Sequence, residues 1–183
     1  SQDFNNRDGI HKRSAEIVNV LLDAYPEASV ARDDYYKTPL NTILSNIFCK
    51  TAEKHEFVKI LLDKGNKKAC EFKAQDGNLP LHTAIETPET NKETVILIAE
   101  TWPDACKVKD KDGNLPLHSA VEAREFSIDV INHIADLYPD GCKVKDRDGN
   151  LPLHIAIERG DKMPVSVVEK LFTMYPEGAT VQD

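Results

Sequence analysis

The stretch "DKDGNLPLH", residues 110–118, decides how this chain folds, because nearly the same letters occur three times. "DRDGNLPLH" spans residues 146–154, and "QDGNLPLH" spans residues 75–82. Three kinds of residue return with the same spacing of 36: the prolines Pro80, Pro116 and Pro152, the histidines His82, His118 and His154, and the cysteines Cys70, Cys106 and Cys142. Self-similarity at a fixed spacing of about 20 to 50 residues is the signature of a repeat architecture.

Each repeat reads as a turn followed by two helices. Asp-Gly-Asn is a tight-turn signal, because glycine takes a positive φ at little cost. The proline of Leu-Pro-Leu-His suits the first position of a helix, so "LHSAVE", residues 117–122, predicts a short first helix. "SIDVINHIADLY", residues 127–138, has apolar residues near helical spacing and predicts a second helix that ends before Pro139. Neither helix can bury its apolar face alone, so stacked units must share one core.

This unit resembles the ankyrin repeat, a turn or β-hairpin followed by two antiparallel helices. The family's pattern, Asp-x-x-Gly-x-Thr-Pro-Leu-His-x-Ala-Ala, is matched by Asp110, Gly113, Pro116, Leu117, His118 and Ala120. The resemblance implies an all-α, ankyrin-type solenoid of stacked helix-turn-helix repeats joined by short β-hairpins or turns. The spacing of 36 departs from the family's usual period of about 33.

The residue before the proline is a second departure from the family. Leucine stands there in three copies, and only Thr38 keeps the family's threonine. Because leucine has no hydroxyl to cap the helix, we expect the preceding asparagines to cap it. These asparagines are Asn78, Asn114 and Asn150.

The repeats predict a single ankyrin-repeat domain over residues 1–183. The expected units are a partial N-terminal repeat at 1–28, repeats at 29–66, 67–103, 104–139 and 140–176, and the start of a further repeat at 177–183. Residues 14–26 match a second helix with no clear first helix before it, and no polar C-terminal cap follows the last unit. These features predict a fragment of a longer array, or a chain whose ends are covered by something else.

The repeated histidines could be metal ligands, catalytic bases or parts of the scaffold. Zinc holds its ligand atoms about 2 Å away, whereas packed helices lie roughly 8–10 Å apart. One position in successive units cannot converge on one ion, so no metal site is expected and the histidines are predicted to be structural. The resemblance implies that they form hydrogen bonds at the start of the first helix.

The same distance argument excludes disulfides among the repeated cysteines, whose Cα atoms would need to lie about 4.4–6.8 Å apart. We expect these cysteines to be reduced and to pack as small apolar residues beneath the hairpins. Reduced thiols suit the cytoplasm, or alternatively the nucleus. A column of lysines, Lys73, Lys109 and Lys145, is expected to be a solvated ladder of compensating charge.

Composition and motifs argue against several classes of function. The formal charge is −8 and no window is strongly basic, so no nucleic-acid partner is expected. The longest apolar run, residues 95–99, is far shorter than the roughly 20 residues of a membrane span, so no membrane insertion is expected. The chain has no Gly-x-Ser-x-Gly, phosphate loop or His-Glu-x-x-His, and a ladder of glutamates spreads out instead of converging on a substrate. No catalytic residue, enzymatic activity or cofactor is therefore expected.

The resemblance implies that a protein partner binds the concave surface formed by the hairpins and the first helices. The family's recognition positions flank the turn glycine and lie late in the first helix. Carried over, the predicted protein-binding residues of the regular units are Gln75, Glu86, Thr87, Lys111, Glu122, Arg147, Glu158 and Arg159. Most Asp, Asn and Glu at such positions are the same in all three units. This region is therefore either mainly scaffold or the contact surface for a partner whose own structure is regular.

The first full unit differs most from the others. In "RDDYYKTPLN", residues 32–41, the pair Tyr35-Tyr36 replaces the Asp-Gly of the turn. Exposed aromatic side chains are good interface anchors, so Asp34, Tyr35 and Tyr36 are predicted to bind the partner, beside a longer helix region over residues 44–57. Alternatively, the tyrosines pack on the neighbouring hairpin.

The leading hypothesis is a non-enzymatic protein-interaction module whose partner binds the concave surface. One alternative is a structural scaffold or assembly subunit with end-to-end stacking of repeats. The other is the regulatory arm of a larger enzyme that this sequence does not include.

Overall fold

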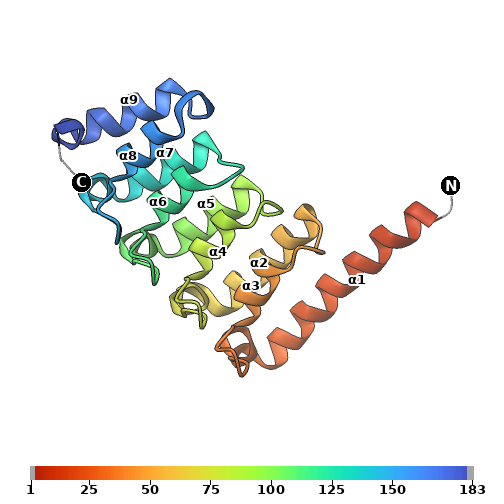
Figure 1. The fold of residues 1–183 in the computed structure, drawn as a ribbon. Helices are drawn as coiled ribbons and strands as arrows, with labels where there is room; N and C mark the ends of the chain where they lie inside the picture. Colours follow the sequence, from red (N-terminus) through yellow and green to blue (C-terminus); the bar gives the residue numbers. More distant parts are fainter. Residues whose placement is uncertain (1–2, 181–183) are drawn as a thin grey trace.

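The computed structural model describes residues 3–180, with side chains from residue 14 onward except at position 66, and shows an elongated stack of helix pairs (Figure 1). The shorter helices of the pairs are α2 (Pro39–Ser45), α4 (Pro80–Glu86), α6 (Pro116–Glu122) and α8 (Pro152–Glu158). Their longer partners are α3 (Thr51–Glu71), α5 (Lys92–Thr101), α7 (Ile128–Leu137) and α9 (Val165–Met174). A long helix, α1 (Asp3–Ala24), precedes the first pair and packs on α3.

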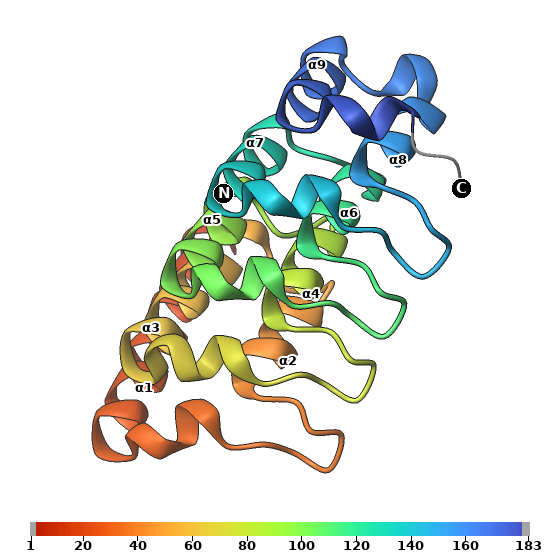
Figure 2. The same cartoon turned by 90° about the vertical axis from the view of Figure 1, so that its left-hand side faces the viewer.

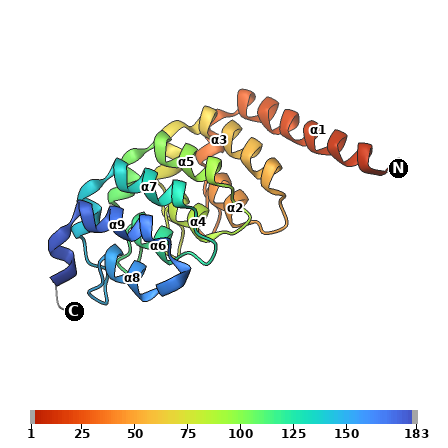
Figure 3. The ribbon, with the colours of Figure 1, turned by 90° about the horizontal axis from the view of Figure 1, so that it is seen from above.

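The stack forms a gentle arc with the short helices on its inner side (Figure 3). The loops that lead into the short helices project side by side from one edge (Figure 2). No strand is assigned within residues 3–180, so these loops are tight turns and not β-hairpins. The predicted all-α solenoid is confirmed. Residues 181–183 of the expected further repeat lie outside the described residues.

The longer helices end where proline follows them. Short 3₁₀ helices then begin the connectors that follow the longer helices: η1 (Pro26–Val30), η2 (Pro103–Lys107), η3 (Pro139–Lys143) and η5 (Pro176–Thr180). A further 3₁₀ turn, η4 (Gly160–Lys162), lies between α8 and α9. In the first unit Lys67 stands where the next unit has Pro103, and α3 continues to Glu71 because nothing interrupts its hydrogen bonds.

The predicted helix region over residues 44–57 is wrong, because α2 ends at Ser45 and α3 begins at Thr51. A turn at residues 46–50 separates them. The fully buried Lys54 donates from Nζ to the Leu44 carbonyl at 3.0 Å, which satisfies a carbonyl at the end of α2.

The first helix starts differently in the first unit and in the others. In the first unit Thr38 forms a capping box with Asn41, as the family's threonine would. The predicted asparagine caps are wrong, because Asn114 donates its amide to Asp110 instead. In that unit the Leu115 backbone N–H donates to His118 Nδ1 at 3.2 Å, so the histidine ring binds the N-cap residue.

The other ring nitrogen of each repeated histidine reaches the next unit. Nε2 faces a carbonyl oxygen and must therefore donate its proton, which leaves Nδ1 as the acceptor of a neutral ring. These bonds join His82 to Asn114 at 3.3 Å, His118 to Val144 at 3.0 Å and His154 to Gly178 at 3.1 Å. The predicted structural role is confirmed, and the histidines also link adjacent units.

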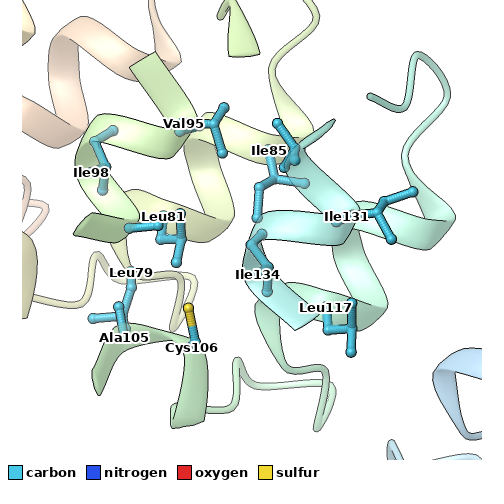
Figure 4. Packing of buried hydrophobic residues seen from close by; sticks show 14 of the residues in the cluster. Leu79, Leu81, Ile85, Val95, Ile98, Ala105, Cys106, Leu117, Ile131 and Ile134 are labelled. Atoms are coloured by element: carbon cyan, nitrogen blue, oxygen red, sulfur yellow. The ribbon is translucent and has the colours of Figure 1, made fainter. Parts of the chain in front are cut away.

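The core runs without interruption along the stack. Figure 4 shows part of it from close by. Leu81, Ile98, Leu117 and Ile134 are fully buried between the two helix layers. The repeated cysteines are also buried and free, as predicted. Burial raises the pKa of their thiols to about 12 in Cys70 and about 11 in Cys106 and Cys142, so the thiols stay protonated and act as apolar side chains.

We predict that His118→Ala lowers the free energy of unfolding by about 1–3 kcal/mol, because it leaves the Leu115 N–H and the Val144 carbonyl without their partner. Urea titration measures the loss, and zinc or a chelator should not change it. His133→Ala is the matched control, because His133 is partly exposed and lies at the surface, with its Nε2 3.5 Å from the exposed carboxylate of Glu100. A melting temperature that drops on chelation would restore the metal hypothesis.

The loss of stability caused by His118→Ala should depend on pH, because burial lowers the pKa of His118 below its usual value. A depressed histidine pKa means that the folded state favours the neutral ring. The ring's contribution is complete above the unfolded pKa of about 6.5 and is lost as pH falls through the folded pKa. The stability gap between wild type and His118→Ala should therefore narrow below about pH 6. A gap that widens in acid would contradict the neutral ring.

Candidate protein-binding site

The turns that project from the stack are held by their own aspartates and by their neighbours. Asp110 Oδ1 accepts from the backbone N–H groups of Asp112 and Asn114, both at 2.8 Å. Gly113 has a φ of +84°, and a Cβ there would lie 2.8 Å from the backbone nitrogen of Arg147. Glycine is thus required both by the turn and by the close approach of the next turn.

Long basic side chains join one turn to the next. Lys73 Nζ donates to the Lys109 carbonyl, and Lys109 Nζ donates to the Lys145 carbonyl, both at 2.6 Å. The expectation that this column is only solvated charge is therefore wrong. The predicted binding residue Arg147 likewise donates to the Lys111 carbonyl and lies 3.7 Å from the Asp112 carboxylate.

The first turn carries Tyr35 and Tyr36 at its tip, with exposed fractions of 66% and 57%. Asp33 Oδ1 holds it by accepting from the backbone of Tyr35 at 2.9 Å and of Lys37 at 2.8 Å. Tyr36 has a φ of 60°, in the left-handed region where the other turns have glycine. A non-glycine residue there costs about 1–3 kcal/mol.

Tyr36 and Tyr35 have different surroundings. The Arg32 guanidinium lies 5.8 Å from the centre of the Tyr36 ring and 4.9 Å from that of Phe72, so Tyr36 is partly held by its neighbours. Tyr35 instead borders a hollow of about 690 Å³ that Gln75 of the next turn also lines. Asp34 is exposed at the same tip. The structure thus places Asp34, Tyr35 and Gln75 on neighbouring turns.

A second hollow, of about 710 Å³, crosses the three regular units. We call it the acidic groove, and its main carboxylates are Glu86, Glu122 and Glu158 at the ends of α4, α6 and α8, and Asp76, Asp112 and Asp148 in the turns. Eight carboxylates line it in total, against the two cations Lys111 and Arg124. It therefore gathers four of the predicted binding residues, Glu86, Lys111, Glu122 and Glu158.

Thr87 and Arg159 are among the predicted residues that do not line this groove. Thr87 faces a small pocket between the loops that join the helices of each pair. Arg159 donates from Nη1 to the Glu122 carbonyl at 2.5 Å, and its guanidinium lies 5.2 Å from the Phe126 ring centre. In this structure Arg159 therefore joins α8 to the preceding unit.

The groove carboxylates differ in how they are held. Glu86 accepts from the Asn78 amide at 3.1 Å and from the Ser119 hydroxyl at 3.4 Å. Burial, with nearby Asp110, raises the pKa of Glu86 to about 6. Among the described side chains, none forms a hydrogen bond or ion pair with the carboxylates of Glu122 and Glu158.

A family model described as ankyrin repeats, in three copies, matches residues 46–148, which is more than half of the chain. The chain belongs to the ankyrin-repeat family. Ankyrin repeats are generally protein–protein interaction modules and are typically non-catalytic. A search of curated proteins found no match for the chain.

The rest of the described ankyrin array shows little that suggests another chemistry. Among the side chains that the structure describes, no three of His, Cys, Asp or Glu are grouped as they would be around a metal ion. Over the same part of the chain, each helix is too short or too polar to cross a membrane.

Sequence reasoning missed one exposed feature of this ankyrin surface. Phe48, in the turn between α2 and α3, is 89% exposed, and the adjacent Ile47 is also exposed. The signal was present in the sequence, because Asn46 and Lys50 flank this apolar pair with polar residues. The prediction of a continuous helix obscured it.

We predict that Glu86→Gln raises the melting temperature at pH 7.5. A carboxylate with a raised pKa is disfavoured in its charged form by the fold, and Gln removes that charge. The Gln oxygen can still accept from Asn78, and its NH2 group can donate to the Ser119 hydroxyl oxygen. The advantage should disappear near pH 4, where Glu86 is protonated in both states. Glu158→Gln, which removes the same charge from a carboxylate that no described side chain holds by a hydrogen bond, is the control for net charge. An equal gain in both variants would show that the local environment of Glu86 is not the cause.

Proposed function

We propose that this ankyrin array is a non-enzymatic interaction module that binds a protein partner through its turns and through α2, α4, α6 and α8. The observation that carries the proposal is the first turn, where a tyrosine occupies a left-handed position at a cost that glycine would avoid. Such backbone strain persists where the side chain has a function that glycine could not provide. Two exposed aromatic rings side by side suit the anchor of an interface.

The neighbouring surface would complete the contact. Tyr35 and Gln75 border one hollow, and a partner seated there would also meet Asp34 at the tip of the turn. The charged residues Lys111 and Arg147, farther along the stack, would lie at the margin, where exposed charges contribute little affinity. We propose that this binding takes place in the cytoplasm or the nucleus, because the buried cysteines are free thiols.

The repeat boundaries expected from the sequence are part of the same proposal. Each of the units at 29–66, 67–103, 104–139 and 140–176 would contribute one turn and one helix pair. The partial repeat at 1–28 would cover the first pair with α1.

A photo-crosslinking amino acid at position 35 should capture a partner from native lysate, whereas the same probe at Glu100, exposed on α5 of the outer layer, should not. Tyr35→Ala with Tyr36→Ala should weaken the captured partner's binding by roughly 30-fold or more, because truncated aromatic anchors often cost above about 2 kcal/mol. Lys111→Ala with Arg147→Ala should have a much smaller effect. Titration with the purified partner measures both.

Tyr36→Gly separates binding from folding. Glycine relieves the left-handed strain, so stability should be unchanged or higher even though the contact with Arg32 is lost. Partner binding should nevertheless fall. If Tyr36→Gly destabilises the array and leaves binding intact, the tyrosine is a packing residue. If the folded double tyrosine variant binds normally and the charge variant does not, the site lies on the regular turns.

A further inference from the structure

The acidic groove has a charge pattern that its own residues do not neutralise. Its two cations, Lys111 and Arg124, face eight carboxylates. Asp110 is engaged within its turn, since it accepts backbone N–H groups. Glu122 and Glu158 form no hydrogen bond or ion pair with any described side chain. The groove therefore presents carboxylates that a cationic ligand could bind.

The spacing of these carboxylates is set by the repeat. Glu86, Glu122 and Glu158 occupy one position in three units, and α4, α6 and α8 pack in succession. Packed helices lie roughly 8–10 Å apart. An extended chain in the polyproline II conformation advances about 3.1 Å per residue with three residues per turn, so every third side chain lies on the same face, about one repeat farther along. A β-strand would point such side chains to alternate faces. A helix advances about 1.5 Å per residue and would need about five to seven residues.

The same spacing argues against a bound metal ion. Metal–oxygen distances are about 2.0–2.6 Å, so carboxylates one repeat apart cannot share an ion. Nucleic acid would be repelled by the groove's net negative charge. A polypeptide with regularly placed cations satisfies both the charge and the length of the groove.

The environment of Glu86 agrees with this assignment. Burial, together with the nearby carboxylates Asp110 and Glu122, raises its pKa to about 6. A cation placed beside it would offset both effects. The hydrogen bonds from Asn78 and Ser119 fix this carboxylate before any ligand arrives, which lowers the entropic cost of binding.

We propose that the acidic groove binds an extended, basic segment of a protein that carries Lys or Arg at every third residue. This inference rests on the proposed function and names the chemistry of the partner. The segment would lie across α4, α6 and α8 with one cation beside each unit's glutamate. The tyrosine turn lies at the first-unit end of this surface, next to the hollow that Gln75 and Asp76 line, so one partner could contact both regions.

The test uses three synthetic, dye-labelled peptides of equal length and charge. One carries Lys at every third residue among Ser and Gly, the second carries the same lysines in adjacent pairs, and the third carries them at every seventh residue of an alanine-rich helix. Fluorescence polarisation against the whole chain gives each Kd at low and physiological salt. The first peptide should bind about tenfold more tightly than the others, and added salt should weaken it.

Matched variants locate the binding. Glu122→Gln with Glu158→Gln should weaken binding of the first peptide about tenfold, because it removes two of the carboxylates that the peptide's cations would contact. Glu93→Gln with Glu100→Gln, which removes the same charge from the exposed side of α5, should leave the Kd unchanged. Circular dichroism checks that both variants fold.

Three outcomes overturn the inference. Equal affinity for the first and second peptides means general charge attraction only, and tighter binding of the third means that the ligand is helical. If the groove variant leaves the Kd of the first peptide unchanged, the peptide binds elsewhere. If the peptides fail while crosslinking at position 35 still captures a partner, only the basic segment is wrong. If the peptide binds as expected and position 35 captures nothing, the first-turn anchor is wrong.

Discussion

The imidazole ring at the start of each regular first helix is the interaction on which the array depends. In His118 one nitrogen accepts from the N-cap backbone of its own unit and the other donates to a carbonyl of the next unit. A single side chain thus starts a helix and sets the distance to the following repeat. At Leu115 and Leu151, leucine can occupy the N-cap position because the histidine ring accepts the N–H of that residue. The adjoining turns are then close enough for Lys73 and Lys109 to bridge them.

This construction explains why the surface is regular. When each unit repeats the same residues at the same spacing, equivalent side chains form a line that runs along the stack. A line of histidines, cysteines or glutamates cannot form a compact catalytic or metal site, because its members stay one repeat apart. It can instead match a ligand that is itself periodic. Among the turns that lead into the short helices, the first breaks the pattern, because Tyr36 stands there in place of glycine.

The sequence predicted the helices well because their signals are local. Proline at the first helical position and apolar residues at helical spacing placed α6 and α7 almost to the residue. The asparagine caps were predicted wrongly because the better acceptor was a ring three residues away. The break after Ser45 was missed because residues 46–50 contain no proline or glycine to mark it.

The predicted binding residues depended on a different kind of information. Aligning the turns placed Tyr36 at a glycine position, which was enough to anticipate an unusual turn. It could not show that Arg32 lies beside the ring or that Arg147 and Arg159 reach backbone carbonyls of neighbouring units. Such contacts depend on the distance between adjacent units, which cannot be predicted from the sequence of one unit. The acidic groove likewise exists only after three units are stacked.

The most direct test of the central interaction is the tautomeric state of the repeated rings. Long-range ¹H–¹⁵N NMR at pH 7 distinguishes a nitrogen that carries a proton from one that does not. The structure predicts that His118 and His154 are neutral, with the proton on Nε2 and a bare Nδ1. A proton on Nδ1, or a charged ring at this pH, would contradict the account, because the ring could no longer accept from its own helix and donate to the next unit.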